Sequence, residues 1–162
     1  MRILMSMILS MANIFPFKFG WINFFGAVIV MLLVIPYVFF EIKFRNRKRR
    51  RMPGFVMISE KFLWSICCIL MIVNFERPEL GFDSKALFVI YLIGNIVLLT
   101  VYCATWISFF IKPAFGKRVT AAVVAVLVFC LSGVTLADIF LIVFASLFGT
   151  CHIFLASQDE YE

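Results

Sequence analysis

The sequence predicts an all-α membrane protein with five transmembrane helices, and three observations lead to that prediction. Apolar residues make up 64% of the 162 residues, and 21 residues are phenylalanine. The mean hydropathy is +1.08, whereas soluble domains contain only about 45–50% apolar residues. The apolar residues also form long runs, each of the length that a membrane crossing needs. A water-soluble core cannot bury such a surplus.

The first three helices are predicted from run length. A helix needs about 20 mostly apolar residues to cross a hydrocarbon core of ~30 Å. Residues 21–40 and 86–111 meet this length, and the shorter run 61–75 meets it when extended back to Phe55. Pro36 lies inside the first run, so we expect a kink there that frees the carbonyl of Leu32.

The last two helices are predicted from a run that is too long for one crossing. Residues 119–155 would extend over about 55 Å as a single helix, so the run is expected to fold into a tight hairpin. The break is expected at residues 132–138. Gly133 suits a helix C-terminus, and Thr135 and Asp138 have the spacing of a capping box for the next helix.

The predicted organisation has three parts: an apolar extension (1–20), a five-helix transmembrane domain (21–156) and an acidic tail (157–162). The extension has the charge and apolar run of a signal peptide but no clear cleavage site. It is too short to cross the membrane, and Pro16 interrupts it. A cleaved segment, a surface helix and a wrongly assigned start codon all remain open.

Loop charges predict the orientation. Residues 41–61 hold eight Lys or Arg and residues 112–118 hold three, whereas residues 76–85 hold two and the hairpin turn none. Because positively charged loops stay in the cytoplasm, we expect the N-terminus outside and the acidic tail in the cytoplasm.

The basic segment after the first helix is expected to contact anionic lipid headgroups, although it would serve equally well as a topology signal alone. Since it adjoins an apolar helix, we expect the lipid bilayer and not a nucleic acid as its partner. Its basic residues are Lys43, Arg45, Arg47, Lys48, Arg49, Arg50 and Arg51.

Two groups of polar residues are candidates for a functional site. Asn95 is the most central polar side chain; it either packs against a neighbouring helix or lines a small polar path with Tyr91 and Thr100. Glu41, Glu60 and His152 lie near the cytoplasmic ends of their helices. For the two acids, ion pairing at headgroup level is the leading interpretation, and for His152 a proton-sensitive role beside one of them is the alternative.

No motif indicates catalysis, a cofactor or a metal. The sequence contains no glycine-rich phosphate loop, H-E-x-x-H or G-x-S-x-G. A single histidine without Cys, Asp or Glu at ligand spacing is a poor metal site. The small residues Ala145 and Gly149, and likewise Ala121 and Ala125, have the spacing of close helix packing, within the hairpin or in a dimer.

Residues 21–30 continuing through Ile35-Pro36-Tyr37, and residues 88–99, resemble segments of small integral membrane proteins of low-GC Gram-positive bacteria. The resemblance covers most of the chain after residue 20. It implies a bacterial plasma membrane and five helices, and it brings no known activity.

Three functions are therefore compatible with the sequence. The first is a non-enzymatic membrane protein that packs with itself or with a larger membrane complex, suggested by the small-residue spacing. The second is an oligomeric small transporter or channel with a weakly polar path at Asn95. The third is a membrane enzyme that uses Glu41, Glu60 and His152 at the cytoplasmic face.

Overall fold

The computed structural model describes residues 22–44, 54–73, 82 and 85–158. Within this part of the chain it contains five helices, each long and apolar enough to cross a membrane. The prediction of an all-α, multi-pass membrane protein is confirmed. The expected extension 1–20 lies outside the described residues, as do Arg45 to Arg51 and the end of the tail. The helices are α2 (Phe24–Lys43), α3 (Gly54–Ile72), α4 (Lys85–Ile111), α5 (Phe115–Leu136) and α6 (Ile139–Ala156).

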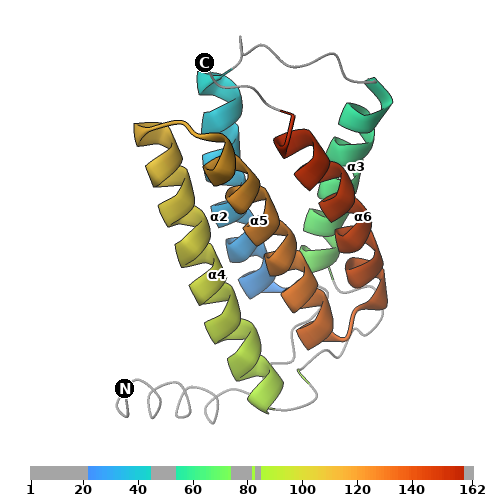
Figure 1. The fold of residues 1–162 in the computed structure, drawn as a ribbon. Coiled ribbons are helices and arrows are strands. Elements are labelled where there is room, and N and C mark those ends of the chain that lie inside the picture. Colours follow the sequence, from blue (N-terminus) through green and yellow to red (C-terminus); the bar gives the residue numbers. More distant parts are fainter. Residues whose placement is uncertain (1–21, 45–53, 74–81, 83–84, 159–162) are drawn as a thin grey trace.

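The helices form a closed ring of neighbours around one core (Figure 1). Going round the ring, α2 packs against α3, α3 against α6, α6 against α5, α5 against α4 and α4 against α2. Half of the most apolar window of α5 is buried, but only 17% of that of α3. Helix α5 is therefore the central element, and α3 is the most weakly embedded one.

Basic residues gather at one end of the bundle, here called the basic end. Helices α2 and α6 finish there, α3 begins there, and the connection between α4 and α5 lies there (Figure 1). The described cations at this end include Lys43, Lys112, Lys117 and Arg118. The opposite end carries the α5–α6 turn with Asp138 and the start of α4 at Lys85.

The α5–α6 hairpin turns where the sequence indicates, but with different caps. Helix α5 continues through Gly133 and Thr135 to Leu136, and Ala137 takes a left-handed conformation with φ 52°. Asp138, not Thr135, is the N-cap of α6 and accepts a hydrogen bond from the Leu141 amide at 2.9 Å. Gly133 instead permits close packing, since a Cβ atom there would lie 2.8 Å from Ile142 Cγ1.

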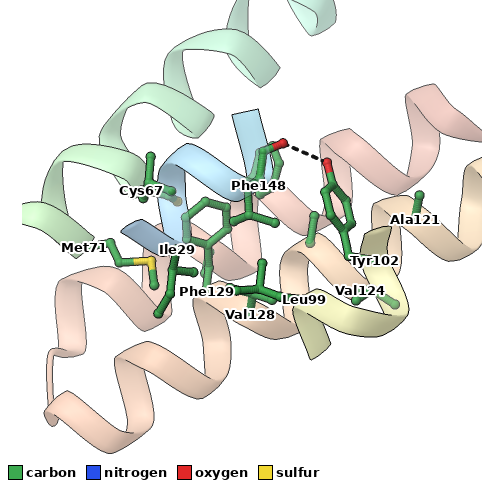
Figure 2. Packing of buried hydrophobic residues seen from close by; sticks show 14 of the residues in the cluster. Ile29, Cys67, Met71, Leu99, Tyr102, Ala121, Val124, Val128, Phe129 and Phe148 are labelled. Atoms are coloured by element: carbon green, nitrogen blue, oxygen red, sulfur yellow. Dashed lines mark hydrogen bonds between the residues drawn. The ribbon is translucent and has the colours of Figure 1, made fainter. Parts of the chain in front are cut away.

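Pro36 lies inside α2, as expected, and a neighbouring helix bonds to the backbone beside it. The hydroxyl of Tyr102 on α4 donates to the carbonyl of Leu33 at 3.0 Å, drawn as the dashed line in Figure 2. The bonded carbonyl lies three residues before the proline, not at Leu32. Because Pro36 removes the helical donor to the Leu32 carbonyl, this bond joins α4 to α2 beside the proline and does not replace the missing helical bond.

Helices α2 and α3 meet closely at the end opposite the basic end. The Asn23 side-chain oxygen caps α2 by accepting from the backbone N–H of Gly26 at 3.0 Å. The backbone N–H of Asn23 donates to the Ile72 carbonyl at 2.7 Å. A Cβ atom on Gly26 would collide with the carbonyl oxygen of Met71. Glycine at position 26 is therefore required for this contact.

We predict that Gly26→Ala lowers the free energy of unfolding in detergent micelles by about 1–3 kcal/mol, the usual cost of overpacking. The cause is the obligatory shift of α2 away from the α3 backbone. Gly54→Ala is the matched control, because a Cβ atom on Gly54 meets nothing within 4 Å. Equal stability of the two variants would contradict the close contact.

Candidate functional site

All five helices contribute side chains to a small cavity in the half of the bundle nearer the basic end. Its volume is about 10 Å³, roughly the minimum for one water molecule. The lining is mixed, because an acid, an imidazole and two phenols lie among apolar side chains. The lining residues are Leu33 and Tyr37 from α2, Glu60 and Trp64 from α3, Tyr102 from α4, Ala125 from α5, and Phe148 and His152 from α6.

Glu60 and His152 form the polar centre of this cavity. Glu60 Oε1 lies 2.7 Å from His152 Nδ1, and the two residues are only 7% and 5% exposed. Since α3 begins at Gly54, Glu60 lies about 9 Å along the helix from its start. His152 lies about 6 Å from the end of α6 by the same rise per residue. Both groups are therefore inside the bundle.

Aromatic rings fix the orientation of the imidazole. The Phe148 ring stacks on His152 with 4.7 Å between ring centroids and an interplanar angle of 22°. The Tyr37 ring lies 6.4 Å from His152 and 4.9 Å from Trp64. These contacts come from α2, α3 and α6, so the imidazole cannot reorient without disturbing three helices.

The contact between Glu60 and His152 can hold one proton in two ways. Either a carboxylate accepts from an imidazolium, or a neutral carboxyl donates to a neutral imidazole. Both arrangements carry no net charge, which matters because an isolated charge is expensive inside a membrane protein.

The other members of this candidate group are placed differently. Glu41 lies near the end of α2, is half-buried and does not line the cavity. The structure therefore brings Glu60 and His152 together, without Glu41. Glu60 lies inside α3, because that helix begins six residues earlier, at Gly54.

Asn95 makes the contacts of a packing residue. It is buried, its Nδ2 donates to the Tyr91 carbonyl at 2.9 Å, and its Oδ1 accepts from Ser132 on α5 at 3.4 Å. Tyr91 is also buried. Thr100, however, is exposed and donates back to the Ile96 carbonyl of its own helix. These three residues therefore do not share one face.

The described basic residues are engaged with the protein in ways that the charge count did not reveal. The Lys43 ammonium lies 3.5 Å from the Phe110 carbonyl and 5.5 Å from the Phe110 ring centroid. Arg118 is buried, 4.6 Å from the Phe40 ring centroid and 5.4 Å from that of Trp106, within the range of cation–π attraction. The predicted headgroup contacts of Arg45 to Arg51 lie outside the described residues.

Sequence reasoning missed the aromatic lining of the site. Tyr37 was not considered a candidate, and Tyr102, Trp64 and Trp106 have positions near helix ends that are equally typical of interfacial anchors. In the structure Tyr102 and Trp106 are both buried, and only Tyr102 of the two lines the cavity. The available signal is spacing, because Tyr102 and Trp106 are four residues apart and therefore share one face of α4.

Among the described residues, no group of three or more His, Cys, Asp or Glu side chains is arranged to hold a metal ion.

Ala145 and Gly149 are buried, and a Cβ atom on Gly149 would lie 2.7 Å from Val126 Cγ1 of α5. This small-residue pair therefore packs within the hairpin.

No protein-family model matches the chain, and no curated protein or solved structure matches it significantly. The resemblance to small membrane proteins of Gram-positive bacteria remains a prediction.

We predict that a double-mutant cycle with Asn95→Leu and Ser132→Ala gives a favourable coupling energy of about 0.6 kcal/mol or less, the average for hydrogen bonds between membrane helices. The long 3.4 Å distance between the two oxygens argues for the lower part of that range. Thr100→Val is the exposed control and should change the free energy of unfolding by less than about 0.5 kcal/mol. Zero coupling, together with a solute flux into liposomes that Asn95→Leu abolishes, would favour the polar path instead.

Proposed function

We propose that this chain is a non-enzymatic integral membrane protein that exchanges a proton at the Glu60–His152 pair and thereby changes how α3 packs on the bundle. The observation that carries this proposal is the 2.7 Å contact between these two buried ionisable side chains. Ionisable groups inside membrane helices are rare and usually functional. A proton is also a ligand that a cavity of about 10 Å³ can admit, unlike a larger solute.

Helix α3 is the element most suited to respond. Its buried residues are Glu60, Cys67 and Met71, which lie seven and four positions apart and so share one helix face. Helix α3 packs mainly against α6 and more lightly against α2 and α5. Glu60 supplies the polar part of this narrow contact face, so the charge of the pair acts directly on α3 docking.

The expected pH response follows from the charges of the pair. A second proton leaves an imidazolium beside a neutral carboxyl, and loss of the shared proton leaves a carboxylate beside a neutral imidazole. Either change leaves a net charge in a poorly solvated site, which is unfavourable. Stability is therefore expected to be greatest at the pH where the pair holds one proton and to fall on both sides.

Among the residues that the structure describes, other ionisable groups also lie near the pair. Tyr37 from α2 and Tyr102 from α4 line the cavity and can titrate, whereas the other lining residues from α3, α5 and α6 cannot. Arg118 on α5 is seven residues from Ala125, about 10 Å along the helix, and keeps its charge at any pH of interest. The exposed Lys61 follows Glu60 on α3.

The setting of this function is part of the proposal. The gathering of Lys43, Lys112, Lys117 and Arg118 at one end supports that end being cytoplasmic. The N-terminus would then be outside, the C-terminus inside, and the pair within reach of cytoplasmic protons. A change in the packing of α3 would then alter how the protein assembles with a second copy or with a larger membrane complex.

The test is the pH profile of the unfolding midpoint in detergent micelles. For the wild type we expect a maximum with losses at lower and higher pH. Glu60→Gln and His152→Asn should each destabilise the protein, by up to about 3–5 kcal/mol, because each breaks the contact between two buried ionisable side chains. The double variant replaces the pair by two neutral amides, so its profile should be flatter.

Lys61→Gln is the matched control, because it removes an exposed charge one residue from Glu60 and should preserve the wild-type maximum. Hydrogen exchange of α3 provides a second readout and should accelerate on both sides of the maximum. Identical pH profiles for the wild type and the double variant would overturn the proposal.

A further inference from the structure

A groove lies between α4 and α5 on the outer surface of the bundle, near the basic end and apart from the Glu60–His152 cavity. It is shallow and open to the outside, and the space over it is about 590 Å³. Small side chains form it, because Ala104 and Thr105 on α4 face Gly116 and Thr120 on α5. The two helices therefore leave between them a space that their own side chains do not fill.

The wall of the groove is apolar although it contains threonines. The hydroxyl of Thr105 donates to the Val101 carbonyl at 2.7 Å, and that of Thr120 donates to the Gly116 carbonyl at 2.9 Å. Both hydroxyls are satisfied by their own helices, which leaves the groove suited to hydrocarbon. From Val101 to Ser108 the groove follows α4 for about 10 Å, within the ~15 Å depth of one leaflet.

A positive charge lies at one end of the groove. Lys117 Nζ donates to the carbonyls of Ser108 at 2.8 Å and Lys112 at 3.0 Å, which holds the ammonium at the α4–α5 connection. The exposed Lys112 is nearby in sequence. Helix α5 also begins here, and its N-cap residue Ala114 provides no side-chain hydrogen bond to the first turn. The residues lining the groove include one cation and no carboxylate.

We propose that this groove binds one phospholipid with an anionic headgroup, its acyl chain along the groove and its phosphate at Lys117 and the start of α5. Charge complementarity selects this occupant. Basic pockets between membrane helices bind anionic headgroups, and helix N-termini favour phosphate. An apolar helix from a second copy would fill the groove equally well but would bury the Lys117 ammonium without a counter-charge, which is unfavourable.

The test compares lipid retained by the purified full-length protein after transfer from vesicles of equal phosphatidylglycerol and phosphatidylcholine with matched acyl chains. Native mass spectrometry counts the bound molecules. We expect one retained phosphatidylglycerol in preference to phosphatidylcholine. Lys117→Gln should reduce that preference about fivefold, the factor that corresponds to ~1 kcal/mol per lysine near anionic lipid.

Gly116→Leu separates lipid binding from folding. Gly116 lines the groove, and a Cβ atom there meets nothing within 4 Å, so we expect a leucine at this position to occupy part of the groove. This variant should keep wild-type stability and lose the retained phosphatidylglycerol. Gly54→Leu is the matched control, since Gly54 is equally open and lies on α3, away from the groove.

Three results would overturn the proposal. The first is wild-type retention of phosphatidylglycerol by Gly116→Leu, and the second is equal retention of the two lipids by the wild-type protein. The third is a wild-type dimer, detected by crosslinking in the same vesicles, that Gly116→Leu abolishes, because the groove would then be an interface between copies. If Lys117→Gln does not fold, Gly116→Leu alone decides.

Discussion

Inside a membrane protein, a carboxyl group and an imidazole have few hydrogen-bond partners, and in this chain Glu60 and His152 contact each other. Hydrocarbon offers no water to solvate a charge, so an ionisable side chain there must pair or lose its charge. The 2.7 Å contact between Glu60 and His152 gives each ionisable side chain a polar partner, and it links α3 to α6. Glu60 is one of only three buried residues of α3, so this contact is a substantial part of the packing of α3 on the bundle.

The rest of the bundle forms a rigid frame around that contact. Helix α5 is held against α6 by two close approaches, at Gly149 against Val126 and at Gly133 against Ile142. Tyr102 ties α4 to α2 through the Leu33 carbonyl. Figure 2 shows Phe129, Val128 and Phe148 in the same buried cluster. In the proposed function, these helices keep the site in place while α3 responds to the charge of the pair.

The five helices were predictable because each apolar run has the length of a crossing, and the hairpin because 37 residues exceed one crossing. The caps of the hairpin were not predictable from the sequence. Gly133 permits close packing against α6 and does not end α5, and the local sequence does not reveal that contact. For the candidate site, the sequence identified Glu60 and His152 as candidate residues. It also predicted that His152 lies beside one of two acids, Glu41 or Glu60. It could not choose between Glu41 and Glu60, because that choice depends on the rotation of α2 and α3 about their axes.

The same limit applies to the basic residues. Arg118 counts as a loop cation in the sequence, yet in the structure it lies buried against Phe40 and Trp106. Charge counting predicts the end of the bundle at which a residue lies, but not which side chains it contacts. Long side chains such as Arg bring an apolar stem and a planar cation, so aromatic neighbours from other helices decide where they lie.

The most direct measurement is nitrogen NMR of the full-length protein in lipid nanodiscs, labelled with ¹⁵N only at histidine. The chain contains a single histidine, so the spectrum reports His152 alone. A proton held between Glu60 and His152 predicts imidazole nitrogen signals that titrate with pH while the protein stays folded, with a titration that changes in Glu60→Gln. Signals that do not titrate, or that titrate identically in Glu60→Gln, would contradict the account.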